Sequence, residues 1–124
     1  MSVTATIVSV LLAQAAPVIP SDTTVTTSDV AYTELSGGQS DAALRKLESA
    51  PGVKSGDPAT LINLGVAYAR AGMADKAIAA YRAAAESQTR YDLELADGTW
   101  MDSRSAARTA LSRLKSAQAQ ALRN

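Results

Sequence analysis

The chain has 124 residues, which is room for one domain, and 47% of them are hydrophobic, which is enough for a modest core. It contains no cysteine and no histidine, so disulfide bonds, thiolate chemistry and histidine-based metal sites or proton transfer are excluded. Aromatic residues make up only 4% and alanine supplies much of the hydrophobic content, so closely packed helices are favoured over β-sheets.

The charges are unevenly distributed along the chain, although its 12 basic and 12 acidic residues cancel. Residues 1–102 hold seven basic and twelve acidic side chains, whereas residues 103–124 hold five basic side chains and no acidic one. The balanced total gives no indication of a nucleic-acid partner. The end of the chain is nevertheless a basic segment.

Residues 1–15 are typical of a signal peptide. The apolar run Ile7–Leu12 precedes Ala13-Gln14-Ala15, a small-x-small pattern that predicts cleavage before Ala16. The run is far shorter than the roughly 20 residues that span a bilayer, so no stable membrane span is expected. No Lys or Arg precedes Arg45, which leaves a disordered, mildly apolar tail as the alternative interpretation.

Residues 16–28 are rich in Pro, Ser and Thr and predict a flexible linker. Together with the signal-like start, this segment favours a periplasmic or secreted protein. The alternative is a cytoplasmic one.

Residues 29–57 predict an imperfect helix pair. A short first helix at 29–35 is followed by the Gly37-Gly38 turn, and a second helix covers 40–50. Pro51-Gly52 is expected to end that second helix and to begin a loop.

A repeat of 34 residues relates this segment to the next one. Six pairs of similar residues share that offset: Gly38 and Gly72, Asp41 and Asp75, Ala43 and Ala77, Leu44 and Ile78, Leu47 and Tyr81, and Ala50 and Ala84.

Residues 58–91 predict a complete antiparallel helix pair. Asp57-Pro58 is a helix start, with Asp as the N-cap and Pro in the first turn. Gly65 lies mid-helix, where it costs about 1 kcal/mol relative to Ala, so we expect the second helix to cross closely there. Gly72 supplies the turn between the two helices. Apolar residues at helical spacing form the facing stripes: Leu61, Leu64 and Tyr68 on the first helix, and Ala77, Ile78, Tyr81, Ala84 and Ala85 on the second.

Position by position, residues 58–91 resemble a tetratricopeptide repeat, and only the closing proline is absent, with Thr89 in its place. The resemblance implies an array of helix-turn-helix units in which residues 29–57 form a degenerate copy. Such units usually bind peptides or helices on the face formed by their first helices. Here the matching positions are Ile62, Asn63, Val66, Ala69 and Arg70.

The end of the chain departs from the repeat pattern. Residues 92–102 alternate apolar and acidic side chains around Asp97-Gly98, which predicts a short β-hairpin or an extended arm. Residues 103–122 predict a capping helix with Ser103 as its N-cap. The expected fold is therefore all-α: an array like tetratricopeptide repeats, with a hairpin or arm inserted before a C-terminal capping helix.

The expected function is non-enzymatic binding of another protein or peptide, as a scaffold or adaptor. Fewer than three intact repeats also favours self-association or a stable partner. The candidate contacts are the five first-helix positions above and Trp100, the only tryptophan, which could instead pack its hairpin onto a helix. Asn63 matches an asparagine that grips a peptide C-terminus in some family members. The other residues of that clamp are missing, so Asn63 is expected to be an ordinary helix-surface amide. No catalytic residue, metal site or cofactor is expected.

Two alternative functions follow from charged residues. The carboxylates of Glu94 and Asp97 would serve a small accessory enzyme. Arg104, Arg108 and Lys115 lie at one edge of the last helix, which would suit an acidic protein or an anionic membrane surface.

Overall fold

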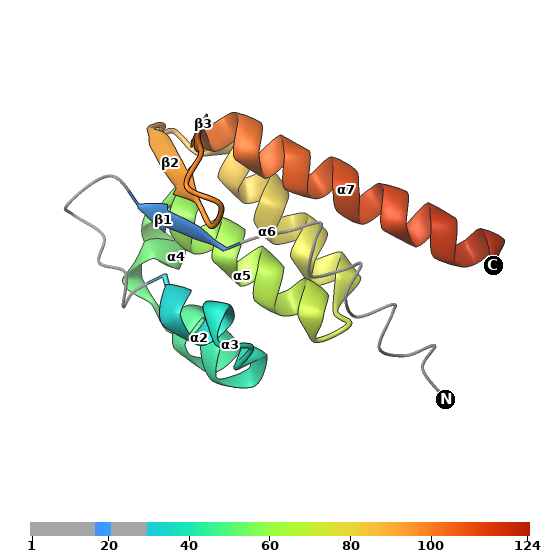
Figure 1. Cartoon of the computed structure of the whole chain (residues 1–124). Coiled ribbons are helices and arrows are strands. Elements are labelled where there is room, and N and C mark those ends of the chain that lie inside the picture. Colours follow the sequence, from blue (N-terminus) through green and yellow to red (C-terminus); the bar gives the residue numbers. More distant parts are fainter. Residues whose placement is uncertain (1–16, 21–29) are drawn as a thin grey trace.

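The computed structural model describes residues 17–20 and 30–124, which form helices and a small sheet (Figure 1). The elements in chain order are β1 (Val18–Pro20), α2 (Tyr32–Ser36), α3 (Ser40–Glu48), α4 (Pro51–Ser55), α5 (Pro58–Arg70), α6 (Ala74–Glu86), β2 (Asp92–Leu95), β3 (Trp100–Asp102) and α7 (Ser103–Arg123). The expectation of a mainly helical fold with a short hairpin before the last helix is confirmed. The expected signal peptide at 1–15 and most of the linker at 16–28 lie outside the described residues.

Helices α5 and α6 form a closely packed antiparallel pair in the centre of the molecule (Figure 1). The Asp57 carboxylate begins α5 by accepting a hydrogen bond from the Thr60 backbone N–H at 2.9 Å. A Cβ atom at Gly65 would lie 2.4 Å from Cε1 of the fully buried Tyr81 ring. The helices therefore cross at Gly65 because no side chain separates them, as the sequence predicts.

Helices α2 and α3 form a second, shorter pair beside α5. Leu35, Ala43 and Leu47 are its fully buried side chains. The first helix is shorter than expected and begins only at Tyr32, because Ala31 adopts a left-handed conformation with φ of 54°.

A short helix, α4, occupies the segment that the sequence assigns to a loop. The preceding helix ends at Glu48, and Pro51 lies in the first turn of α4, where its missing N–H breaks no hydrogen bond. A Cβ at Gly52 would lie 2.3 Å from Thr60 Oγ1. Gly52 thus lets α4 approach α5 rather than only ending a helix.

The sheet has three antiparallel strands in the order β1-β2-β3. The hairpin of β2 and β3 turns at Asp97-Gly98, where Gly98 has φ of 85°, a conformation that favours glycine. The prediction of a linker over 16–28 is wrong at Val18–Pro20, which pairs with β2 in the register Val18↔Leu95. Two apolar residues between prolines show no periodicity, so only the tertiary pairing defines this strand.

Helix α7 packs along α6 and extends beyond it (Figure 1). Its buried face lies in the first half and consists of Ser103, Ala106, Ala107, Ala110 and Leu114. From residue 119 to the end every residue is exposed, and Leu122 is 89% exposed. Helix α7 therefore covers the helix array as far as residue 118, and its last residues extend beyond the array.

Across residues 17–20 and 30–124, no helix combines the length and the apolar character needed to cross a membrane.

Candidate functional site

The face of α5 that the sequence offers to a partner is covered by β1. Ile62 and Val66 are each 1% exposed and Asn63 is fully buried. Strand β1 lies directly on this helix (Figure 1). The expectation that these three residues line an open groove is wrong, because a segment of the same chain fills it.

Asn63 holds β1 through its main chain. Its Oδ1 accepts a hydrogen bond from the Val18 N–H at 2.8 Å, and its Nδ2 donates to the Val18 carbonyl at 3.0 Å. Nδ2 also donates to the Val30 carbonyl at 3.0 Å. The expectation of a helix-surface amide is therefore wrong: Asn63 is a buried connector between α5, β1 and the start of α2.

The last two predicted groove residues, Ala69 and Arg70, are half-buried at the far end of α5. Arg70 Nη1 donates to the Leu35 carbonyl at 2.8 Å, which ties α5 to the end of α2. Burial lowers the pKa of the Arg70 guanidinium, and the nearby Tyr81 opposes that shift. Arg70 thus has a structural contact of its own.

Trp100 is 60% exposed and lies on β3 opposite Glu94 of β2. Its strand neighbour Met101 is half-buried and packs against the core. Alternation along the strand directs Trp100 to the outer face. The alternative interpretation, in which Trp100 packs the hairpin onto a helix, does not describe this arrangement.

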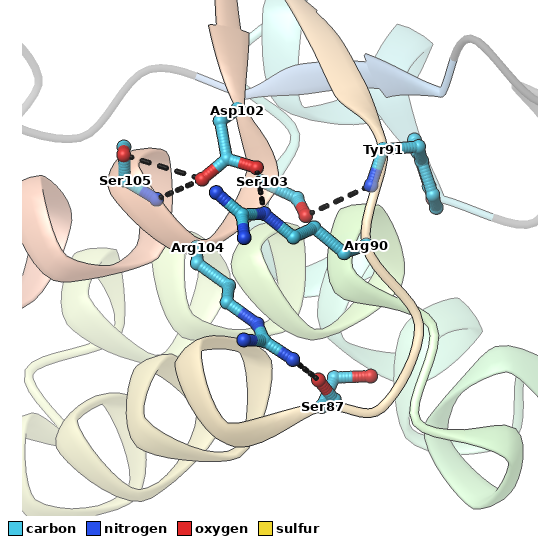
Figure 2. Close-up of polar contacts among 7 residues, drawn as sticks. All are labelled: Ser87, Arg90, Tyr91, Asp102, Ser103, Arg104 and Ser105. Atoms are coloured by element: carbon cyan, nitrogen blue, oxygen red, sulfur yellow. Dashed lines mark hydrogen bonds and ion pairs between the residues drawn. The ribbon is translucent and has the colours of Figure 1, made fainter.

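The hairpin that carries Trp100 is fixed to the ends of α6 and α7 (Figure 2). Ser103 Oγ accepts a hydrogen bond from the Tyr91 N–H at 3.2 Å, and Arg104 Nη2 donates to the Ser87 carbonyl at 3.1 Å. The first bond joins the residue before β2 to the start of α7, which directly follows β3, and the second joins the start of α7 to the end of α6. Trp100 is therefore displayed on a fixed platform.

Asp102, and not Ser103, is the N-cap of α7 (Figure 2). Its carboxylate accepts from the Ser105 N–H at 3.1 Å and from Arg90 Nε at 2.6 Å. The hydrogen bond from Arg90 is the main reason why the pKa of Asp102 lies below its usual value of 3.8, and partial burial opposes it. The prediction of Ser103 as the cap is wrong by one residue, because the fully buried Ser103 hydroxyl bonds to Tyr91 instead.

Two substitutions separate the roles of the Asp102 carboxylate. Asp102→Ala should lower the free energy of unfolding by about 1 kcal/mol through loss of the cap, whereas Asp102→Asn keeps a capping oxygen and should cost less. The ion pair adds little because the Arg90 side chain is 58% exposed. Urea unfolding at pH 7 measures both effects, and equal losses would show that the charge, not the cap, is what matters.

The pH dependence of the same contact follows from its lowered pKa. The stability that ionised Asp102 contributes is complete above the ordinary value of 3.8 and is lost as the pH falls through the lower folded-state value. The difference in melting temperature between the wild type and Asp102→Asn should therefore shrink in strong acid.

Glu94 and Asp97, the candidate carboxylates of an enzyme, have different surroundings: Glu94 lies on β2 opposite Trp100, and Asp97 lies in the hairpin turn. Asp97 Oδ1 accepts hydrogen bonds from the Thr99 N–H at 3.0 Å and the Thr99 hydroxyl at 2.6 Å, within the hairpin turn. These bonds lower the pKa of Asp97, which is the opposite of what a general acid needs. Asp97 has a turn-forming role.

The basic edge of α7 is divided between structure and surface. Arg104 is half-buried against the Ser87 carbonyl, while Arg108 and Lys115 are exposed. The three residues therefore do not form one solvent-facing basic patch.

Sequence reasoning missed two parts of this region, Val18 and the cap at Asp102. Asp102 carries a usable signal, because Asp followed three residues later by Ser105 is as good a helix start as Ser103. Val18 carries none, because its role depends on Asn63, which lies 45 residues away.

The chain was compared with protein-family models, with curated proteins and with solved structures, and no match was found in any of the three.

Proposed function

We propose that this chain is a non-enzymatic protein-binding module built on helix pairs like those of tetratricopeptide repeats. The close crossing at Gly65 and Tyr81 supports this fold assignment, since the repeat pattern requires a small residue facing an aromatic one there. Gly38 and Gly72, which are 34 residues apart, have similar left-handed φ angles of 76° and 78°. Each of these glycines forms the turn between the two helices of its pair, as the repeat pattern predicts.

The observation that carries the binding role is Trp100. Among the described residues, the large apolar side chains that are exposed are Met73, Trp100 and Leu122. Tryptophan is the residue type most enriched at the energetic centres of protein interfaces. Trp100 also lies on a hairpin held at both ends, so binding through it would cost little ordering entropy.

The surroundings of Trp100 favour a partner with a basic group. Glu94 lies opposite Trp100 on the neighbouring strand, so an aromatic face and a carboxylate are presented side by side. A partner that places an apolar side chain on the indole and a lysine or arginine beside it would fit both. A second copy of this chain, with its basic α7, is one such protein.

We place the protein in the cell envelope or outside the cell because residues 1–15 resemble a signal peptide. Mass spectrometry of the chain from its native host should find a form that begins at Ala16. An intact form beginning at Met1 in the cytoplasm would contradict this location.

The binding role is tested by capturing partners from envelope extracts of the native host on immobilised protein. Replacement of Trp100 by alanine should weaken binding of the captured protein at least tenfold, equivalent to about 1.4 kcal/mol. Leu122→Ala is the matched control, because Leu122 is 89% exposed but lies away from the hairpin.

Calorimetric titration of the purified partner gives the affinities, and circular dichroism checks that each variant is folded. Equal binding by the wild type and Trp100→Ala would contradict the proposed contact. If neither an extract protein nor a second copy binds the wild type, the binding role itself is wrong.

A further inference from the structure

We infer that the groove between α5 and the edge of β2 is a binding site for an extended segment of a partner protein, and that Val18–Pro20 is the chain's own occupant, which the partner replaces. This inference rests on the proposed role as a protein-binding module; it shares Glu94 with the proposed contact at Trp100 but adds the groove that β1 occupies. The partner segment we assign has an aliphatic residue followed by a lysine or arginine.

The groove recognises a strand through its backbone. Both polar groups of Val18 bond to the Asn63 amide, at 2.8 Å and 3.0 Å, while the register with β2 continues along the opposite edge of the strand. An amide that pairs with one N–H and one C=O of the same residue accepts any extended residue except proline, which has no N–H. The site therefore requires an extended backbone, whatever the side chain.

A single pocket adds a preference for an aliphatic side chain. Val18 is 1% exposed and belongs to the same core cluster as Ile62, Val66 and the fully buried Leu93. A charged side chain at this position would be buried without a partner, at a large cost in free energy. The residue that takes the place of Val18 must therefore be apolar and of similar size.

At the next position, that of Ile19, a partner segment could bind more tightly than the chain's own strand. Ile19 is the register partner of Glu94, whose side chain is half-buried on β2. Opposite charges at directly paired positions of antiparallel strands stabilise the pair, and isoleucine carries no charge. A basic residue at this position would thus bind better than the resident strand. A second copy of this chain would bring the same isoleucine and gain nothing.

The groove favours exchange of one strand for another over simple release. If β1 left, the fully buried Asn63 would lose both bonds to Val18 and keep only the one to Val30, and the edge of β2 would lose its partner; buried polar groups without partners are costly. An incoming strand restores the same bonds. The remaining barrier is the tether, since a covalently attached segment has an effective concentration of the order of millimolar.

The test uses fluorescein-labelled peptides and full-length protein in a fluorescence anisotropy titration. One peptide has the sequence of residues 16–21 and a second has lysine in place of Ile19. Two protein variants change the competing strand in opposite directions: Ile19→Glu puts a like charge opposite Glu94, and Ile19→Lys puts an opposite one there. Neither changes the buried Val18.

The lysine peptide should bind Ile19→Glu most tightly, the wild type less, and Ile19→Lys least, with about tenfold between the two variants. It should also bind more tightly than the parent peptide, and Glu94→Gln should remove that advantage. A lysine peptide methylated on the valine nitrogen cannot donate to Asn63 Oδ1 and should lose binding altogether.

Equal binding of the methylated peptide, or the same affinity in both Ile19 variants, would overturn the inference. If Ile19→Glu fails to fold, the wild type and Ile19→Lys still give the predicted order. Light scattering that finds a strand-exchanged dimer of Ile19→Glu would identify a second copy as the occupant and refute the assigned partner. If a captured partner binds through Trp100 but the peptides do not bind, the proposed function stands and the inference about the groove is wrong.

Discussion

Replacing Gly65 with leucine should lower the free energy of unfolding by about 1 to 3 kcal/mol, because the crossing of α5 and α6 has no space for a side chain. A Cβ atom there would lie 2.4 Å from Cε1 and 2.6 Å from Cδ1 of Tyr81. The Tyr81 ring is fully buried. For a domain of this size, the loss corresponds to a fall in melting temperature of about 4 °C or more.

Two comparisons isolate the crossing as the cause. Ala79→Leu introduces the same side chain at an exposed position of α6 and should leave the melting temperature nearly unchanged. Tyr81→Leu removes the ring that Gly65→Leu meets, so the double variant should lose less stability than the two single losses added together. An additive result would mean that the two residues do not contact each other.

The central helix pair could be predicted from the sequence because each of its features is local. Asp57-Pro58 specifies a helix start within a few residues, and the buried positions of α6 recur at helical spacing, whereas α5 is buried on all sides from Pro58 to Ala67. Gly65 is the informative exception, since a glycine inside a helix costs stability unless a close approach requires it. The structure shows that approach at Tyr81.

The third strand could not be predicted in the same way. Val18–Pro20 is too short to show alternation, and a proline before it and another at its last position are typical of loops. Its strand conformation depends on Leu93–Leu95 and on one asparagine, all distant in sequence. Contacts of this kind leave no periodic signal.

The candidate site was only partly predictable for the same reason. Trp100 was identified by its residue type and its place beside a turn, and its exposure depends only on alternation along β3. The burial of Ile62, Asn63 and Val66 depends on what covers them. The repeat pattern predicts an open face for these residues. It gives no sign of the covering strand, because that strand lies outside the repeat.

A substitution at Asn63 should have an effect at least as large as the one at the helix crossing. Asn63→Asp replaces Nδ2, which donates to the carbonyls of Val18 and Val30, with an oxygen that repels both. The new carboxylate would also be buried. At pH 7 we expect a loss of about 3 kcal/mol or more in the free energy of unfolding, together with release of β1.

The pH dependence separates this loss from a simple loss of packing. Burial and the two carbonyls should raise the folded-state pKa of the introduced Asp above its unfolded value of about 3.9, so the folded protein binds the extra proton. Stability then falls as the pH rises above that unfolded value. Asn63→Leu, which has a similar size and does not titrate, is the control.

Urea unfolding of both variants between pH 4 and pH 7 gives the comparison. The deficit of Asn63→Asp relative to Asn63→Leu should be small near pH 4 and should grow toward pH 7, while hydrogen exchange at the Val18 amide becomes faster in both. A deficit that does not change with pH would show that residue 63 is hydrated rather than buried between the two carbonyls. An unchanged exchange rate at Val18 would show that Asn63 does not hold the strand.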